Sequence, residues 1–354
     1  MMKNRTVYKA DENNVRVIGR TAYRDGVRWL GYSLSGVEFD FCGTSLSAEL
    51  STDWVNDEPW KHIFQPYIAV LVNGKLEKRI AVNEGKAVYE LFSCEKAEKV
   101  RIRIVKLSEN AFSKVGLSAL FADGEIMPTK PLSERRIEFV GDSITCGFGI
   151  EGKSAAEGFT TATENPLENY ASLTAERLGS EYQLVSWTSI GVYSNSVKDD
   201  RTEPDNGWTM PVIYDHTDKS TDLMLGNEPE LWDFSRFAPQ LIVVNLGTND
   251  KDFTRGIPER TAAFENCYRE FILHIREKNP QAYILCVLGV MGQELCPQVE
   301  NAVKSLCDEK ISAMRFDVQS EADGIGSEEH PNLTTHKKMS DRLFEEIERL
   351  KIFQ

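Results

Sequence analysis

The hydrophobic pattern of the chain changes near residue 130, and the two halves that it separates predict different folds. Before this point, short alternating or apolar runs such as "YIAVLVNG" and "VRIRIVKL" are separated by turn sequences such as "VNGK" and "NEGK". Short runs between turn residues are typical of antiparallel strands. About eight of them between Val15 and Phe121 predict a β-sandwich of jelly-roll type.

The second half alternates apolar runs with segments of helical period. The apolar runs are residues 137–140, 184–187, 241–246 and 283–288. Between the last two runs, Phe264, Tyr268 and Ile275 recur at helical spacing, and Asn279-Pro280 ends this helix. Strands that alternate with helices predict an α/β fold with a parallel sheet covered on both faces. We therefore expect two domains, a jelly-roll-like β-sandwich over residues 1–128 and a three-layer α/β/α domain over residues 129–354.

Composition narrows the class of function. The net charge of −14 argues against binding to nucleic acid, which depends on clustered Lys and Arg. The longest apolar runs are far shorter than the roughly 20 residues that span a bilayer, so we expect no membrane association. The first residues lack a secretory apolar stretch, and the seven cysteines form no CxxC pair. We therefore expect a cytoplasmic protein with free thiols.

Polar residues follow the first three apolar runs, where an open α/β sheet binds its ligands. Ser143 follows the first run, Gly191 the second and Asn249 the third, and His330 lies in a later loop, "GSEEHPN". A serine hydroxyl needs a neighbouring base to act as a nucleophile, and we assign that role to His330. The Ser143 N–H, the Gly191 N–H and the Asn249 side-chain amide are then candidate donors to the oxyanion.

Each of these residues also has a purely structural interpretation. A serine after a strand is a common helix N-cap, and Gly191 and Asn249 suit turns or caps. His330, in a polar loop before a proline, has the character of an exposed bystander. Their occurrence in this order at successive strand ends favours a hydrolase site.

The four blocks "GDSIT", "SIGVYSN", "GTND" and "HPN" resemble the motifs of the SGNH (GDSL-type) hydrolase superfamily, over roughly residues 135–354. With a jelly-roll-like domain before it, the chain resembles carbohydrate esterase family 2, whose members remove acetyl groups from xylan and related sugars. The resemblance implies that Ser143 is the nucleophile, that His330 is the base, and that Gly191 and Asn249 are oxyanion donors.

The third catalytic member is less clear from the motif. Many members of the superfamily place Asp three residues before the histidine, where this chain has Ser327. In carbohydrate esterase family 2 the acid, when present, lies two residues before the histidine, which makes Glu328 the candidate orienter. Glu329 and Asp323 remain open, as does a Ser-His dyad whose imidazole is held by a backbone carbonyl.

Two aromatic residues in the long segment before residue 233, Trp208 and Tyr214, are candidates for a platform under a sugar ring. They fit a small core beneath a loop equally well. His62, His216 and His274 have no carboxylate or thiolate at ligand spacing, so we expect no metal and no cofactor.

These observations predict a serine esterase that removes O-acetyl groups from xylan-derived or related oligosaccharides through an acetyl-enzyme. The expected partner is the acetylated oligosaccharide; the oligomeric state, a homo-oligomer included, is left open. One alternative is another acyl-ester enzyme of the same fold, such as a lipase, thioesterase or acyltransferase. A second alternative, of a different class, is a non-catalytic carbohydrate-binding protein.

Overall fold

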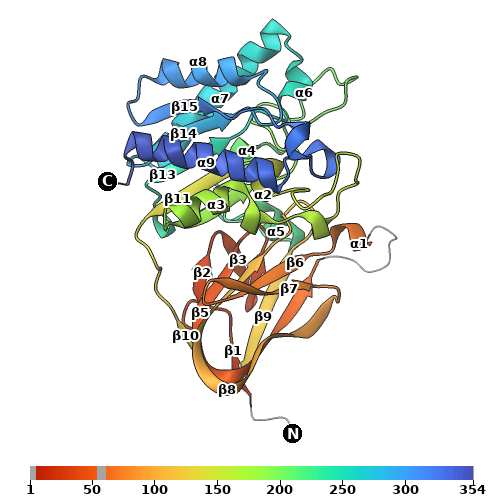
Figure 1. Cartoon of the computed structure of the whole chain (residues 1–354), viewed down its shortest axis with the longest axis vertical. Coiled ribbons are helices and arrows are strands. Elements are labelled where there is room, and N and C mark those ends of the chain that lie inside the picture. Colours follow the sequence, from red (N-terminus) through yellow and green to blue (C-terminus); the bar gives the residue numbers. More distant parts are fainter. Residues whose placement is uncertain (1–4, 54–60, 354) are drawn as a thin grey trace. The chain divides into compact units, whose positions relative to one another are not determined.

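The computed structural model describes residues 5–53 and 61–353, and their contacts divide the chain into two compact units. The first unit contains the residues up to Pro131, together with Thr160–Ala162 and Thr217–Glu230. The second unit contains the remaining residues from Leu132 onward. Two short segments that follow residue 128 thus pack with the first unit. A single split at residue 128 would assign them to the second. Figure 1 labels the elements of both units.

Ten strands in the described part of the first unit form one antiparallel sheet. They are β1 (Thr6–Tyr8), β2 (Arg16–Ile18), β3 (Thr21–Arg24), β4 (Val27–Leu30), β5 (Gly36–Thr52), β6 (Tyr67–Val72), β7 (Lys75–Ala81), β8 (Lys86–Lys106), β9 (Val115–Ala122) and β10 (Glu125–Pro128). The central order is β3-β4-β9-β5-β8-β6-β7, with β1 paired to β9 and with β2 and β10 paired to β5. The unit also contains α1 (Lys61–Phe64) and α5 (Lys219–Met224). The expected antiparallel β domain is confirmed.

β5 and β8, the two longest strands among the described residues, are bent along their length. The pairing of β5 with β8 shifts register between Gly43 and Ser45, and Figure 1 shows β8 curving at one end of the unit. At this point Asp123 accepts hydrogen bonds from the N–H groups of Thr44 (2.8 Å) and Ser45 (2.9 Å). A side chain therefore satisfies the backbone donors that the bulge removes from the ladder. The curled sheet encloses a core that includes Phe39 and Ile102.

The second unit contains a parallel sheet of five strands in the order β12-β11-β13-β14-β15. These are β11 (Arg136–Gly141), β12 (Glu181–Ser186), β13 (Leu241–Asn245), β14 (Tyr283–Leu288) and β15 (Ile311–Arg315). The first four match the four apolar runs of the sequence. β15, with the sequence "ISAMR", was not expected, because only Ile311 and Met314 of it are buried.

Helices cover both faces of this sheet, which confirms the three-layer α/β/α fold. They are α2 (Ser143–Cys146), α3 (Tyr170–Arg177), α4 (Met210–Ile213), α6 (Lys251–Thr254), α7 (Pro258–Lys278), α8 (Cys296–Leu306) and α9 (Leu333–Leu350). From β11 the chain moves to β12 in one direction, and from β13 through β14 to β15 in the other. Because parallel crossovers are right-handed, α3 and the pair α7 and α8 lie on opposite faces. In Figure 1, α9 lies beside α3, against which it packs.

Short 3-10 helices connect several of these elements. They are η1 (Thr161–Thr163), η2 (Pro166–Glu168), η3 (Phe234–Arg236), η4 (Glu321–Asp323) and η5 (Ser327–Glu329). The last two lie between β15 and α9, in the segment that carries His330. This segment leads into α9, where Asn332 caps the helix by accepting a hydrogen bond from the Thr335 N–H at 3.0 Å.

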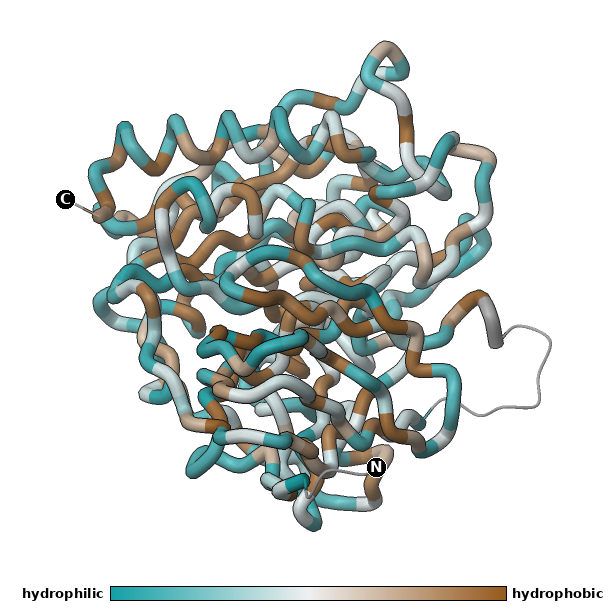
Figure 2. Tube along the Cα trace, turned by 60° about the horizontal axis from the view of Figure 1, so that its bottom comes forward, coloured by the Kyte–Doolittle hydropathy of each residue, from teal (hydrophilic) through white to brown (hydrophobic). Residues whose placement is uncertain are grey.

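The long helices have the amphipathic pattern that the sequence predicts. In α9 the buried side chains include Thr335, Met339, Leu343 and Ile347, at intervals of four residues. Figure 2 shows hydrophobic and hydrophilic residues alternating along the tube next to the C-terminus. One face of α9 therefore packs on the domain while the other faces solvent. Among the described residues, no helix combines the length and the apolar character that crossing a bilayer requires.

Candidate active site

Ser143 begins α2, directly after the end of β11. Asp142 is the N-cap of this short helix, and its Oδ1 accepts a hydrogen bond from the Ile144 N–H at 3.0 Å. The interpretation of Ser143 as the helix cap is therefore wrong. A Cβ on Gly141 would lie 2.1 Å from Oγ1 of Thr145, so only glycine fits this tight strand-to-helix turn. The turn holds Ser143, which is 4% exposed, at the carboxyl end of the sheet.

His330 contacts Ser143, from which it is separated by 187 residues in the sequence. Its Nε2 lies 2.9 Å from Oγ of Ser143, and its Nδ1 lies 2.9 Å from the carbonyl oxygen of Glu328. A carbonyl oxygen only accepts hydrogen bonds, so the proton of a neutral imidazole is placed on Nδ1. Nε2 is then free to accept the proton of the serine hydroxyl, as a general base must.

The candidate triad requires a hydrogen bond between the carboxylate of Glu328 and the imidazole of His330. The carboxylate does not make this bond. Its Oε1 instead accepts a hydrogen bond from the Phe159 N–H at 3.1 Å. Glu328 has a left-handed backbone conformation (φ 48°). Its carbonyl faces His330, while its side chain extends toward the Phe159 N–H. Asp323 is not the orienter either, because both of its carboxylate oxygens bind the ammonium of Lys338. The geometry matches the dyad with a carbonyl-held imidazole.

The predicted oxyanion donors lie at the ends of β11, β12 and β13. Nδ2 of Asn249 donates to the carbonyl oxygen of Ile190 at 2.9 Å and lies 3.5 Å from Oδ2 of Asp142. Asn249 thus connects the loops that follow the three strands. The Gly191 N–H donates to Oδ1 of Asn195 at 3.1 Å. A Cβ on Gly191 would lie 1.9 Å from the carbonyl oxygen of Ser194, which explains why glycine is needed there.

The loop that carries Gly191 is held by Asp250, a residue whose contribution the sequence did not reveal. The buried carboxylate of Asp250 accepts hydrogen bonds from the N–H groups of Val192 (3.1 Å), Tyr193 (2.7 Å) and Ser194 (3.0 Å). Burial raises the pKa of Asp250 to about 6, against the effect of these donors. Burial likewise raises the pKa of Asp142 to about 7. Two carboxyl groups thus organise the loops around Ser143 without contacting His330.

Phe148 packs beside the imidazole and Phe159 stacks on Phe148, and neither contact was predicted from the sequence. The ring of Phe148 lies 4.3 Å from that of His330 and stacks at 3.6 Å on Phe159. Burial in these surroundings lowers the pKa of His330. The imidazole is therefore neutral, and competent as a base, at neutral pH.

The two candidate platform residues lie in different environments. Tyr214 is fully buried, and its hydroxyl donates to Oε1 of Glu138 at 2.7 Å, so it belongs to the core and offers no surface to a sugar. Trp208 is partly exposed, and its carbonyl oxygen accepts a hydrogen bond from Nδ2 of Asn195 at 3.1 Å. Since Asn195 also binds Gly191, Trp208 adjoins the predicted oxyanion loop. Its contact with substrate stays a prediction.

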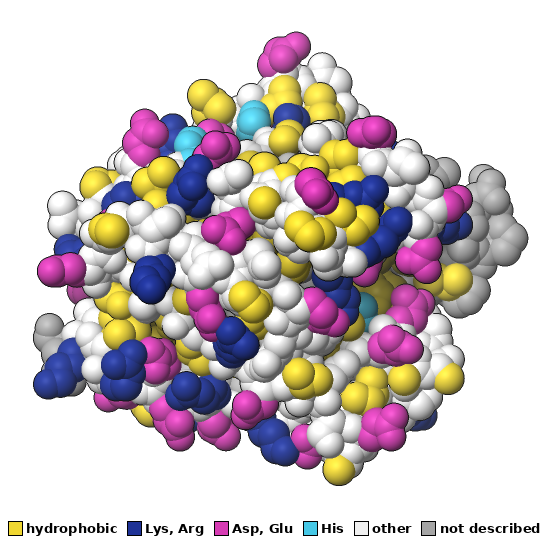
Figure 3. Space-filling view, turned by 90° about the horizontal axis from the view of Figure 1, so that it is seen from above, with side chains coloured by type: hydrophobic (Ala, Val, Ile, Leu, Met, Phe, Trp, Pro, Cys, Tyr) yellow, Lys and Arg dark blue, Asp and Glu magenta, His cyan; other side chains and the backbone are white. Residues whose placement is uncertain are grey.

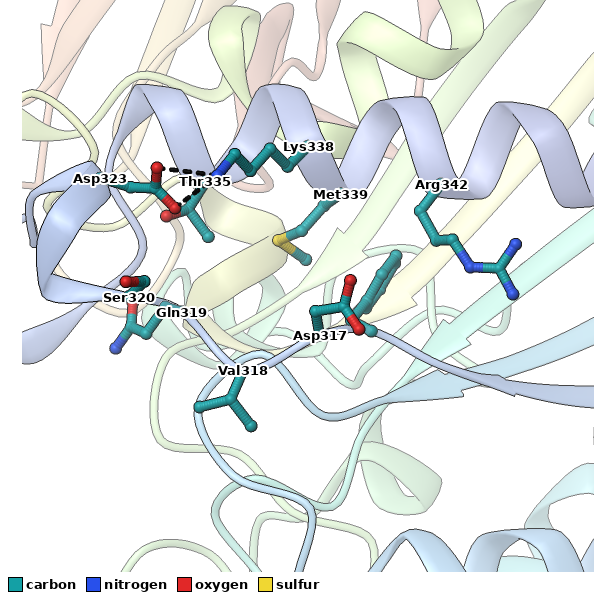
Figure 4. Close-up of a pocket in the computed structure, with 10 residues that line it drawn as sticks. Asp317, Val318, Gln319, Ser320, Asp323, Thr335, Lys338, Met339 and Arg342 are labelled. Atoms are coloured by element: carbon teal, nitrogen blue, oxygen red, sulfur yellow. Dashed lines mark hydrogen bonds and ion pairs between the residues drawn. The ribbon is translucent and has the colours of Figure 1, made fainter.

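A pocket of about 180 Å³ lies between α9 and the segment after β15 (Figure 4). Asp323 and Lys338 form an ion pair on its wall, and Met339 contributes an apolar surface. Neither Ser143 nor His330 lines this pocket. Its lining residue Gln319 donates from Nε2 to the carbonyl oxygen of Glu329 at 2.6 Å, which connects the pocket wall to the loop that carries His330.

The surface in Figure 3 carries acidic and basic side chains side by side. No extended basic area appears on this face of the described residues.

Two family models match the chain. Residues 139–315 match the GDSL-like lipase/acylhydrolase family, and residues 17–131 match the N-terminal domain of carbohydrate esterase 2. The first match contains Ser143, Gly191 and Asn249, and it ends before His330.

Curated relatives and solved structures agree with these matches. The chain is 31% identical to the cellulase/esterase CelE of Acetivibrio thermocellus, over 95% of this chain and 40% of CelE. It is 28% identical to an acetylxylan esterase/glucomannan deacetylase of Cellvibrio japonicus, over 99% of this chain and 92% of the relative. The structure is similar to a family two carbohydrate esterase from Clostridium thermocellum, solved in complex with cellohexaose (TM-score 0.81, 28% identity, 96% of this chain and 100% of the other). A family two carbohydrate esterase from Cellvibrio japonicus gives a TM-score of 0.83 at 25% identity, over 99% of each chain.

The chain spans less than half of CelE but nearly the whole of the smaller relative. Both of its units are covered by the solved structures that it resembles. The chain therefore belongs to the GDSL-like lipase/acylhydrolase family, and its first part is the N-terminal domain of carbohydrate esterase family 2.

Proposed function

We propose that the chain is a serine esterase that removes O-acetyl groups from xylan-derived or related oligosaccharides. The observation that carries this proposal is the contact of 2.9 Å between Oγ of Ser143 and Nε2 of His330, with Nδ1 held by a carbonyl oxygen. The substrate class is supported by the relatives named as acetylxylan esterase/glucomannan deacetylase.

In the first half of the reaction, Nε2 of His330 takes the proton of Ser143 while Oγ attacks the acetyl carbonyl carbon. The resulting oxyanion receives hydrogen bonds from the Ser143 N–H and from Nδ2 of Asn249. The Gly191 N–H becomes a third donor to the oxyanion when its hydrogen bond to Oδ1 of Asn195 is broken or becomes bifurcated. The tetrahedral intermediate then expels the sugar oxygen, which takes the proton from His330, and an acetyl-enzyme remains.

In the second half, His330 removes a proton from water as the water oxygen attacks the acetyl-enzyme. Collapse of the second tetrahedral intermediate breaks the bond to Oγ of Ser143. The serine recovers its proton from the imidazole, and acetate leaves. The reaction thus consumes one water and needs no other reagent.

Replacement of the nucleophile tests the proposal. Acetate release from acetylated xylo-oligosaccharides, followed by mass spectrometry, should fall by a factor of about 10⁴ or more in Ser143→Ala. Ser305→Ala is a matched control, since Ser305 lies on α8 and its hydroxyl donates to the carbonyl oxygen of Ala302 in the same helix. Acetate release that survives Ser143→Ala would contradict the proposal. A preference for long-chain p-nitrophenyl esters over the acetate would instead indicate a lipase.

A second candidate function is binding of a β-linked glucan, favoured by the family two esterase solved in complex with cellohexaose. Titration calorimetry of cellohexaose with Ser143→Ala separates the two functions. If the wild-type protein has no esterase activity and Ser143→Ala binds cellohexaose, carbohydrate binding is the function.

A further inference from the structure

The backbone just before His330 has an unfavourable conformation. Glu328 (φ 48°) and Glu329 (φ 62°) are consecutive left-handed residues, although neither is glycine. The Cβ of a non-glycine residue makes the left-handed backbone region unfavourable, so such a conformation persists only where the surrounding structure holds it. We call residues 326–330 the histidine loop. What holds this loop also determines where the Glu328 carbonyl points.

On one side, the histidine loop is held by residues 149–159, which we call the clamp segment. The N–H of Ser327 donates to the carbonyl oxygen of Gly149 at 3.0 Å, and the N–H of Glu328 donates to that of Glu157 at 3.1 Å. The return bond comes from the Phe159 N–H to Oε1 of Glu328, also at 3.1 Å. This bond joins the main chain of the clamp segment to a side chain of the histidine loop, and its acceptor is Glu328, whose carbonyl faces the imidazole.

On the other side, the loop is held from the wall of the pocket in Figure 4. Nε2 of Gln319 donates to the carbonyl oxygen of Glu329 at 2.6 Å. Within the loop, the N–H of Gly326 donates to the carbonyl oxygen of His330 at 2.8 Å. Both left-handed residues are thus fixed by side chains, Glu328 by its own and Glu329 by that of Gln319.

The bond from Phe159 also affects the ring packing beside the imidazole. Phe159 stacks on Phe148, and Phe148 packs against His330. Loss of the Glu328 carboxylate would free the main chain of Phe159 and therefore loosen the rings as well as the loop. The same carboxylate therefore acts on the imidazole through the main chain and through the rings.

We propose that Glu328 is a positioning residue: its carboxylate locks the clamp segment onto the histidine loop, and its own carbonyl thereby faces Nδ1 of His330. This inference rests on the proposed esterase function. It assigns Glu328 a structural task that needs a hydrogen-bond acceptor and no negative charge. A catalytic triad, by contrast, needs the charge next to the imidazole.

Three variants separate these roles. Glu328→Ala removes the acceptor, and kcat for p-nitrophenyl acetate should fall by about 10- to 100-fold with little change in KM, because the imidazole is misplaced. Glu328→Gln keeps an acceptor oxygen for the Phe159 N–H and should retain kcat within about threefold, since the Glu328 carbonyl that holds Nδ1 of His330 stays in place. Glu329→Gln is the matched control, because it removes a neighbouring charge and leaves the clamp intact.

A readout independent of activity is hydrogen exchange of the clamp segment, measured by mass spectrometry. Exchange over residues 149–159 should become faster in Glu328→Ala and remain at the wild-type rate in Glu328→Gln and Glu329→Gln. Circular dichroism checks that each variant is folded.

Two results would overturn the inference. If Glu328→Gln loses about 10⁴-fold in kcat, its carboxylate is the charged member of a triad. If Glu328→Ala keeps wild-type kcat and exchange, the clamp does not position His330. A wild-type protein without esterase activity refutes the proposed function, while the exchange data still decide whether the clamp exists.

Discussion

His330 shows how one residue's surroundings determine a measurable property of the reaction. Burial lowers the pKa of its imidazole from the usual 6.5, while the bond to the Glu328 carbonyl and the charges of Glu328 and Glu329 act in the opposite direction. Only the neutral imidazole can take the proton of Ser143. Activity is therefore lost as the pH falls through the pKa of His330.

We predict that kcat/KM for p-nitrophenyl acetate has an acid limb with its midpoint below pH 6.5 and is level around neutrality. Initial rates measured across roughly pH 5 to 8 give the midpoint, which reports the free enzyme. Ser143→Ala supplies the non-enzymatic background at each pH. A midpoint well above 6.5 would mean that a carboxylate stabilises the imidazolium, contrary to the geometry found here.

The sequence identified the nucleophile and the base of the site but left the partner of the imidazole open. Ser143 and His330 could be paired because a nucleophile and a base have few alternative residue types. The partner of Nδ1 is a carbonyl oxygen, which every residue has, so nothing in "GSEEHPN" could separate the Glu328 carbonyl from its carboxylate. The prediction for Tyr214 failed for another reason: the partner of its hydroxyl, Glu138, lies 76 residues away in the sequence, so no local pattern could show that Tyr214 is buried.

Among the elements, the loop after β12 depends on a carboxylate from the loop after β13. Asp250 precedes α6 but makes no capping bond to it, and its oxygens instead accept hydrogen bonds from residues 192–194. Because burial raises the pKa of Asp250 to about 6 from 3.8, the folded protein binds its proton more tightly than the unfolded chain does. Protonation between these pH values therefore favours the folded state.

We predict that this carboxyl makes the free energy of unfolding rise as the pH falls from 8 toward 4. The burial penalty on the charge is present above about pH 6 and is relieved below it, and the gain is of the order of 1–3 kcal/mol. Asp250→Asn lacks the titration, so the difference in unfolding free energy, wild type minus variant, should increase with acidity. Urea unfolding at several pH values measures this difference. A difference that decreases with acidity would show that the hydrogen bonds outweigh burial and hold the pKa low.

Element prediction succeeded where burial covers a whole strand and failed where it does not. β13 is buried at every residue and was recognised from its apolar run. β15 is an edge strand with two buried residues, so its sequence has neither a continuous nor an alternating pattern. β8 contains the predicted run "VRIRIVKL" but begins well before it, at Lys86, because the polar residues that precede the run continue as strand in the structure.

At the scale of the whole molecule, the first unit is assembled from separate parts of the chain. Residues 217–230 join it through polar contacts. The Nδ2 of Asn110 donates to Asp218 at 2.9 Å. The guanidinium of Arg24 donates to Asp222 from Nε (2.9 Å) and from a terminal nitrogen (3.1 Å). Arg24 and Asp222 are 198 residues apart, so no local pattern could indicate that they meet.

The cytoplasmic location expected from the sequence stays a prediction.

The pair of Arg24 and Asp222 gives a test of how this discontinuous unit is held together. Asp222 is fully buried, while the Arg24 side chain is 23% exposed. Asp222 also accepts a hydrogen bond from the Glu230 N–H at 2.9 Å, which orders the end of the segment. Removing the guanidinium leaves a buried carboxylate without its counter-charge, and such a loss destabilises proteins by about 3–5 kcal/mol.

We therefore predict that Arg24→Ala lowers the free energy of unfolding by several kcal/mol, on the order of that range, in urea unfolding followed by circular dichroism. Lys78→Ala is the control, because the ion pair of Lys78 with Glu90 lies at the surface of the same unit and should contribute about 0–1 kcal/mol. Hydrogen exchange of residues 217–230 should become faster in Arg24→Ala alone. If both variants lose the same small amount, the segment is held by its apolar contacts and not by this pair.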